Sequence, residues 1–276
     1  MMRYLLFPLL MLLGACASIE RVALPKPTLL SPGFALAEDT TRARVDHTAW
    51  DSFLGIYVRQ DAYGINRVAY GEVTDADRQK LQGYLAELAQ TEVEVLTREQ
   101  QLAFWINLYN AETVELILQH YPVTSIRDIT DGALSFGPWD RPVTTVDGQA
   151  LTLNDIEHRI IRPIFDEPRI HYALNCAAVG CPNLMNRAWR AATLERDLEA
   201  AERAYVNDDR GVRVDPNGAL TLSKIYIWFQ EDFGANEREV LDRLQKVADP
   251  ERAAAISARK GVRRYAYDWS LNEALQ

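Results

Sequence analysis

Apolar residues recur three or four positions apart in two early stretches of the chain, which is the spacing of one helical face. The first stretch contains Trp50, Phe53, Leu54 and Tyr57, and the second contains Leu81, Tyr84, Leu85 and Leu88. A longer helix is expected over residues 98–119, because Thr97 and Gln100 form a capping-box pattern before it and Pro122 follows it. The first half of the chain is therefore predicted to be mainly helical.

The second half mixes helical and strand patterns. Helices are predicted over 152–162, ending before Pro163, over 193–206, from Ser223 onward, and over 250–261. Strands are predicted as a tight hairpin over 143–153, as a second hairpin around 215–218, over 265–269, and over 169–175, where apolar and polar residues alternate. Many helices with short hairpin strands indicate the α+β class. We therefore expect a single helix-rich domain with short antiparallel strands.

The first fifteen residues have the pattern of an export signal. A short basic start ends at Arg3, and the apolar run over 4–13 is too short to cross a hydrocarbon core that needs about 20 residues in helix. Residues 13–16 (LGAC) resemble a bacterial lipoprotein box, which predicts cleavage before Cys16 and acylation of that residue, palmitate included. Ala17 at the next position favours, by analogy with bacterial lipoproteins, the outer membrane. The alternative is a plain secretory signal cut after Ala15.

These patterns divide the chain into a signal peptide over 1–15, a lipidated Cys16 with a flexible tether over 16–45, and an α+β domain over 46–276. The domain is expected to face the periplasm, with the lipid on Cys16 as its contact with the membrane. Thirty Lys and Arg against 39 Asp and Glu give a net charge of −9, without a basic block. Nucleic acid is therefore not expected as a partner, because its binding depends on neutralising phosphates.

Residues 174–182 (LNCAAVGCP) contain the two cysteines of the expected mature domain, Cys176 and Cys181. The predicted strand runs into a small-residue loop, whose backbone N–H groups could form an oxyanion nest. A cysteine becomes a nucleophile when a neighbouring imidazolium stabilises its thiolate. His158, with Glu157 beside it, is one candidate partner. His171 lies five residues before Cys176, which on a regular strand places the two side chains on opposite faces.

Other interpretations stay open. In an oxidising compartment, Cys176 and Cys181 can simply form a local disulfide. Asn107 and Asn110 lie on one face of a helix that is apolar nearly all round, and buried amides need partners, so they either hold loop backbone or serve a site. No metal-ligand spacing such as CxxC or HExxH involves these residues, so we expect neither a metal nor a cofactor.

Five segments together resemble the domain of unknown function 547 family. They are FWINLYNA (104–111), IEHRIIRP (156–163), RIHYALNCAAVGCP (169–182), SKIYIWFQEDFG (223–234) and YDWSLN (267–272). The resemblance implies a papain-like, cysteine-centred hydrolase or acyltransferase, with the family's Glu-His pair on Glu157 and His158 and its first cysteine on Cys176. Bacterial members usually have glycine at the position of Ala177. If that position needs a positive φ, alanine costs about 1 kcal/mol.

The resulting hypothesis is an exported, membrane-anchored cysteine hydrolase or acyltransferase that acts on a peptide or envelope amide or ester. Cys176 attacks, and His158 takes its proton and later protonates the leaving group. Asn107 or Asn110 orients the imidazole or binds an oxyanion, and Glu157 is a further candidate for orienting the imidazole. The alternative is a non-catalytic envelope lipoprotein that binds a ligand or partner, with the two cysteines joined structurally. A thiol–disulfide exchanger is the third hypothesis.

Overall fold

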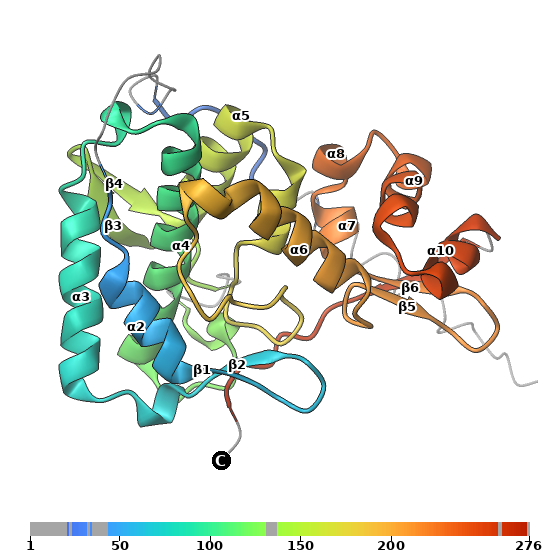
Figure 1. Ribbon diagram of the computed structural model, residues 1–276, viewed down its shortest axis with the longest axis horizontal. Coiled ribbons are helices and arrows are strands. Elements are labelled where there is room, and N and C mark those ends of the chain that lie inside the picture. The colour runs from blue at the N-terminus through green and yellow to red at the C-terminus, as the bar shows by residue number, and fades with distance from the viewer. Residues whose placement is uncertain are drawn as a thin grey trace, which may run out of the picture. The chain divides into compact units, whose positions relative to one another are not determined.

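The computed structural model describes residues 21, 24–31, 34, 44–130, 137–258 and 261–274 (Figure 1). The predicted signal peptide over 1–15, Cys16 and most of the predicted tether lie outside the described residues. Contacts group the chain into a larger unit, Pro25–Tyr205 with Asp268–Gln276, and a smaller unit, Met1–Leu24 with Val206–Tyr267. Helices predominate and the strands are short, so the predicted α+β class is confirmed. Among the described residues, no helix has the length and apolar character needed to span a membrane.

In the larger unit, three successive helices pack together, each against the next one in the sequence. They are α2 (Thr48–Tyr57), α3 (Asp75–Ala89) and α4 (Arg98–His120), and α3 contacts both of the others (Figure 1). The predicted apolar stripes of α2 and α3 are buried as expected. α4 begins with the predicted capping box between Thr97 and Gln100, and its residues 101–117 are buried on every side. This helix therefore forms the centre of the larger unit's core.

Two hairpins lie in the larger unit. β1 (Val58–Gln60) pairs antiparallel with β2 (Asn66–Val68), and β3 (Pro142–Val146) pairs antiparallel with β4 (Gln149–Thr152). The second of these is the predicted hairpin, and its turn residues Asp147 and Gly148 both have positive φ. Short 3₁₀ turns connect the main elements: η2 (Tyr70–Glu72), η3 (Val93–Val95), η4 (Ile126–Asp128) and η7 (Ala191–Thr193). α6 (Leu194–Val206) follows close to its predicted range.

The helix expected over 152–162 does not stop at Pro163. It is a π-helix, η5 (Asp155–Ile161), that continues directly into α5 (Arg162–Phe165). Pro163 lies in the first turn of α5, where a missing N–H is tolerated. The prediction that proline ends this helix was therefore wrong.

The strand expected over 169–175 was also wrong, because residues 168–172 form a 3₁₀ helix, η6 (Pro168–Tyr172). Ile170, His171 and Tyr172 are all buried, so consecutive side chains, rather than alternate ones, face the core. His171 and Cys176 therefore do not lie on one regular strand, and their side chains are not held on opposite faces of it.

The smaller unit contains a three-stranded sheet in the order β5 (Val212–Val214), β6 (Leu220–Ser223), β7 (Val262–Ala266). β5 and β6 form the predicted hairpin, whereas β6 and β7 are parallel, which departs from the all-antiparallel expectation. A parallel pair needs a long crossover, and the helices between these strands provide it. They are α7 (Ile225–Trp228), α8 (Gln230–Phe233), α9 (Glu237–Val247) and α10 (Pro250–Ser257).

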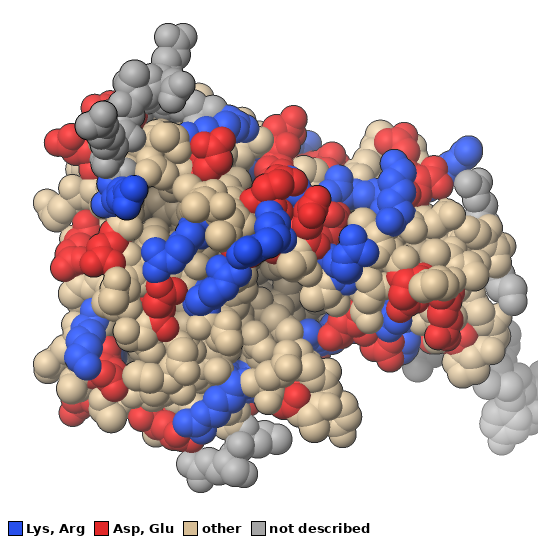
Figure 2. All heavy atoms as spheres, viewed as in Figure 1, with Lys and Arg blue, Asp and Glu red and all other residues tan. Residues whose placement is uncertain are grey.

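Surface charges of both signs are interspersed on the face shown in Figure 2. In the larger unit, Arg169 lies 2.6 Å from carboxylates of both Glu167 and Glu195, and Arg59 lies 2.5 Å from Glu72. The Arg59–Glu72 pair is exposed, and exposed ion pairs stabilise a fold by less than about 1 kcal/mol each. The fold therefore depends on the apolar core around α4 more than on these pairs.

Candidate active site

The two cysteines lie in the loop that follows η6. Cys176 is partly exposed and Cys181 is buried. Their sulfur atoms are 2.6 Å apart, and the backbone N–H of Cys176 donates to the sulfur of Cys181 at 3.1 Å. They are not joined by a disulfide, although a small change of side-chain torsions would bring the sulfurs to the bonding distance of about 2.05 Å. The loop thus holds two adjacent thiols of different exposure.

Two buried asparagines fix the start of this loop. Asn110 of α4 donates to the carbonyl of Ala173 at 2.9 Å and accepts the N–H of Asn175 at 2.8 Å. Asn175 donates to the carbonyl of Pro182 at 2.8 Å and accepts the N–H of Ala177 at 2.9 Å. Asn110 therefore holds loop backbone, which is one of the two roles that the sequence left open for it.

Residues 268–272 run antiparallel beside the loop. The N–H of Gly180 donates to the carbonyl of Asp268 at 2.8 Å, and the N–H of Asn272 donates to the carbonyl of Ala177 at 2.9 Å. The YDWSLN segment, which the family resemblance included without a role, is therefore a clamp on the cysteine loop. We call residues 268–272 the C-terminal clamp.

Most N–H groups of the loop are engaged within the protein. Those of residues 177, 179, 180 and 181 donate to the side chain of Asn175 and to the carbonyls of Ser270, Asp268 and Ala178. These four groups cannot at the same time form the oxyanion nest that the sequence suggested. The expectation was wrong for them because the clamp supplies acceptors for two of these groups and the loop itself supplies acceptors for the other two.

Ala177 has a φ of 59°, in the left-handed region that favours glycine. We predict that Ala177→Gly raises the free energy of unfolding by up to about 1 kcal/mol, because glycine adopts this conformation without a Cβ clash. Urea unfolding at neutral pH measures the change. The matched control is Ala178→Gly: this neighbour is not among the residues with positive φ, and glycine there should destabilise the protein. Equal losses at both positions would contradict the prediction.

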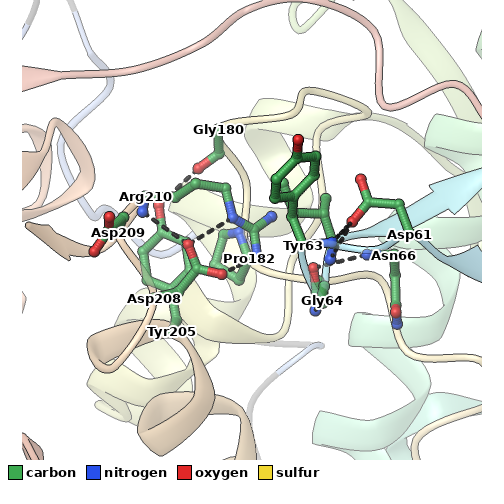
Figure 3. A network of polar contacts seen from close by, with 12 residues as sticks. Asp61, Tyr63, Gly64, Asn66, Gly180, Pro182, Tyr205, Asp208, Asp209 and Arg210 are labelled. Atoms are coloured by element: carbon green, nitrogen blue, oxygen red, sulfur yellow. Dashed lines mark hydrogen bonds and ion pairs between the residues drawn. The ribbon is translucent and has the colours of Figure 1, made fainter.

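Further contacts hold the other side of the loop (Figure 3). The hydroxyl of Tyr205 donates to the carbonyl of Gly180 at 2.6 Å. The carboxylate of Asp61 accepts the N–H of Tyr63 at 2.9 Å in the β1–β2 turn, and the side chain of Asn183 donates to the carbonyl of Gly64 at 2.8 Å. Because Asn183 follows the second cysteine closely, this turn is fixed to the end of the cysteine loop.

Tyr109 of α4 links the cysteines to a buried carboxylate. Burial, the charge on Glu157 and the two nearby cysteines raise the pKa of the Tyr109 hydroxyl well above its ordinary value, and this hydroxyl is hydrogen-bonded to Glu157. Glu157 of η5 in turn has its Oε1 atom 3.6 Å from Nδ1 of His171. The Tyr109 hydroxyl is therefore hydrogen-bonded to a buried carboxylate and lies within electrostatic reach of both thiols.

Glu157 is held as a carboxylate despite its burial. Burial alone would raise its pKa, but His158, His171 and Arg162 outweigh that effect and lower the pKa to about 2. A buried anion of this kind is stable only while its cationic and hydrogen-bonding partners stay in place. Glu157 is therefore suited to orienting an imidazole and stabilising its protonated form.

The two histidines near Glu157 favour different tautomers. Nδ1 of His158 lies 3.3 Å from Nη1 of Arg162, and a guanidinium can only donate, so the ring proton of His158 belongs on Nε2. Nδ1 of His171 lies 3.6 Å from the carboxylate of Glu157, so the proton of a neutral ring belongs on Nδ1. Of the two, His171 has the tautomer that a general base oriented by a carboxylate requires.

Asn107 lies among other partners. Its side chain donates to the carbonyl of Trp189 and accepts that residue's N–H, both at 2.9 Å. Nε2 of His47 is 3.4 Å away, and Nδ1 of His47 is 2.7 Å from the hydroxyl of Tyr84. Burial, with the nearby Arg190, lowers the pKa of His47 to about 4, which keeps this ring neutral. The structure thus brings Asn107 to His47 and to the backbone of Trp189, and not to the cysteine loop.

Tyr109 and the C-terminal clamp were missed as site elements in the sequence. A signal for Tyr109 existed, since it lies between Asn107 and Asn110 on a helix predicted to be buried, where a hydroxyl needs a partner. Asn272 had no such signal, although its side chain accepts the hydroxyl of Tyr70 at 2.9 Å. Its partners are distant in sequence, so no local pattern reports them.

A cavity of about 320 Å³ lies between residues 44–46 and the region following α3, and none of the candidate catalytic side chains lines it. Within the part of the chain that the structure describes, no group of three or more His, Cys, Asp and Glu side chains is arranged to hold a metal ion.

Comparison with known families adds one finding. Residues 93–206 match the family model described as "Protein of unknown function, DUF547". No curated protein and no solved structure matches the chain. The DUF547 match begins at η3 and reaches the end of α6, so it contains Tyr109, Glu157, His171 and both loop cysteines. The C-terminal clamp and the smaller unit's sheet lie beyond it.

Proposed function

We propose that this chain is a cysteine-dependent hydrolase or acyltransferase with Cys176 as its nucleophile. The observations that support this most are the buried carboxylate of Glu157, 3.6 Å from Nδ1 of His171, and the hydroxyl of Tyr109, which is hydrogen-bonded to Glu157 and within electrostatic reach of both cysteines. A nucleophilic thiol needs a base, and that base needs a third group to orient it. The DUF547 match contains all of these residues but carries no activity with it.

The proposed reaction is acyl transfer through a thioester. The sulfur of Cys176 attacks the carbonyl carbon of an amide or ester, and its proton passes to an imidazole nitrogen. The imidazolium then protonates the leaving amine or alcohol as the old bond to carbon breaks. Water or a second nucleophile attacks the thioester and releases the thiol. A peptide or an envelope component is the substrate class that the proposed location favours.

We assign the base to His171, because its Nδ1 lies 3.6 Å from the carboxylate of Glu157, which can orient the ring and stabilise its protonated form. His158, the base predicted from the sequence, stays the competing assignment. It lies next to the same carboxylate, but its Nδ1 lies 3.3 Å from the guanidinium of Arg162, which can only donate, and not from a carboxylate that would orient the ring. Single substitutions of the two histidines separate these assignments.

The pH dependence of Cys176 alkylation tests the proposal in the full-length chain. We expect labelling by iodoacetamide, followed by mass spectrometry from pH 4 to 9, to have a midpoint well below the ordinary thiol pKa of about 8.5. His171→Gln should move this midpoint to about 8.5, and His158→Gln should move it less. A parent midpoint near 8.5 contradicts the proposed function. A shift in His158→Gln alone would instead make His158 the base.

A second function is favoured by the 2.6 Å separation of the two sulfurs. In a non-catalytic protein that binds a ligand or partner, Cys176 and Cys181 would form a structural disulfide. The same labelling experiment distinguishes the two functions when reductant is omitted. Recovery of both cysteines in one linked peptide, with labelling only after reduction, supports the structural role.

We also propose that the chain is exported, acylated on Cys16 and held at the outer membrane with its domain facing the periplasm. The pattern of residues 1–17 supports this, and the match over residues 93–206 does not bear on it. Mass spectrometry of the mature N-terminal peptide tests the anchor. An acylated Cys16 supports it, and an unmodified N-terminus contradicts it.

A further inference from the structure

We infer that residues 25–31 and Phe34, which precede the predicted domain, position the helical turn that carries Glu157 and His158. The inference rests on the proposed function, because it concerns the same site. Thr28, Leu30 and Phe34 are the residues that carry it. Together they would be positioning residues, acting through the helix and not on the substrate.

The helical turn after His158 lacks one backbone hydrogen-bond donor. Pro163 has no N–H, so it cannot donate to a carbonyl one turn earlier. In the π register of η5 that carbonyl belongs to His158, and in the α register of α5 it belongs to Arg159. Unpaired buried carbonyls are costly, so donors from elsewhere are needed at these two positions.

The N-terminal segment supplies both donors. The N–H of Thr28 donates to the carbonyl of His158 at 3.2 Å, and the N–H of Leu30 donates to the carbonyl of Arg159 at 2.9 Å. Alternate residues donate, as along the edge of a strand. Leu29 between them is 48% exposed, and its N–H makes no hydrogen bond within the described residues. The segment thus supplies the donor that Pro163 lacks, whichever of the two carbonyls that proline leaves unpaired.

Side chains fix the same segment at both ends. Phe34 is buried, and its ring meets that of Trp105 of α4 edge-on at 5.4 Å between centroids. Nη1 of Arg162 donates to the carbonyl of Pro25 at 3.4 Å. This part of the predicted flexible tether is therefore packed on the larger unit. Arg162 is also one of the groups that lower the pKa of Glu157. The segment therefore contacts both the backbone of the helical turn and a side chain that stabilises the charge on Glu157.

The N-terminal donors help to set the position of the Glu157 carboxylate. Glu157 directly precedes the residue whose carbonyl Thr28 binds, and its side chain must reach both Tyr109 and His171. Loss of the N-terminal donors would let this turn change register and move Glu157 away from His171. The reactivity of Cys176 should then fall, although the cysteine loop itself is held by other contacts, those of Asn175 and the C-terminal clamp.

Proline substitutions in the full-length chain test this inference. Leu30→Pro removes the donor to Arg159, and Leu29→Pro is the matched control because it removes an N–H without a partner. Two readouts are compared: hydrogen exchange of the peptide over 155–165, and the pH profile of Cys176 alkylation. We expect Leu30→Pro to speed exchange in 155–165 by about tenfold or more and to raise the alkylation midpoint, with Leu29→Pro like the parent.

Each result decides the inference. Equal exchange rates in Leu30→Pro and Leu29→Pro overturn the inference. Where the parent alkylation midpoint is depressed, faster exchange in Leu30→Pro with an unchanged midpoint overturns it too. If the parent thiol itself has an ordinary profile, the proposed function fails, while faster exchange in Leu30→Pro still shows that the segment holds the turn. If Leu30→Pro does not fold, Thr28→Pro removes the longer of the two bonds, and the same two readouts apply to it.

Discussion

Replacing Glu112 with glutamine is expected to raise the free energy of unfolding by about 3 kcal/mol at pH 7 and by almost nothing at pH 4.5. Glu112 lies on α4 with only 6% of its surface exposed. Burial raises its pKa from 4.5 to about 8, and a hydrogen bond with Thr144 offsets this only in part. Between pH 4.5 and pH 8, Glu112 keeps its proton in the folded chain and releases it in the unfolded chain.

The sign follows from that difference in bound protons. Stability falls as pH rises from 4.5 towards 8, by about 1.4 kcal/mol per pH unit. Glutamine cannot ionise, so the variant lacks this slope and keeps the hydrogen-bonding shape of the protonated acid. Urea unfolding at several pH values between 4.5 and 8 measures it.

The control for this substitution is Glu115→Gln on the same helix. Glu115 is also buried, but Arg78 lies 2.8 Å from its carboxylate. Removing that charge leaves a partly buried guanidinium without its partner, so the variant should be less stable than the parent at pH 7. A Glu112→Gln protein that is no more stable than the parent at pH 7 would show that Glu112 is ionised in the folded chain.

The same exchange at Glu157 should have the opposite sign. We expect Glu157→Gln to lower the free energy of unfolding by about 3 kcal/mol at pH 7, because it removes the anion that His158, His171 and Arg162 surround. The pKa of Glu157 is lowered from 4.5 to about 2, so its contribution is complete above pH 4.5 and is lost as pH falls towards 2. The variant should therefore unfold in acid with a shallower pH dependence.

Unfolding by urea between pH 2 and pH 7 measures both effects. Glu112 and Glu157 are both buried, but only Glu157 has cationic partners. Comparing the two Gln variants therefore separates the effect of charge on the free energy of unfolding from the effect of burial. Equal stability of Glu157→Gln and the parent at pH 7, with the same slope in acid, would mean that the carboxylate makes no net contribution. Cys176 alkylation in this variant reports separately on the site.

Elements with local signals were predictable from the sequence. The capping box at Thr97 and the Asp147-Gly148 turn were found because their hydrogen bonds and backbone conformations are fixed by neighbouring residues. The strand over 169–175 failed because alternation marks a strand only where one face meets solvent. In η6 consecutive residues are buried, so the alternation carried no information about faces.

The candidate site was predictable in part for a similar reason. Cys176 and Glu157 stood out by residue type and by family resemblance, whereas Tyr109, which is hydrogen-bonded to Glu157, did not. The base was harder to assign, since the tautomers of His158 and His171 depend on partners that only the fold supplies. The same holds for Asn107, whose partners Trp189 and His47 lie far from it in sequence.

The C-terminal clamp has a consequence for the order in which the chain is made. The cysteine loop is synthesised long before Asp268–Asn272, yet the N–H groups of Val179 and Gly180 find their acceptors only in that later segment. A ribosome-bound or partly translocated chain would therefore carry both thiols, Glu157 and His171 while lacking the strand that shapes the loop. Val179 and Gly180 would pair their N–H groups only once the last segment has been released to lie beside the loop, so the loop would reach its final shape at the very end of synthesis.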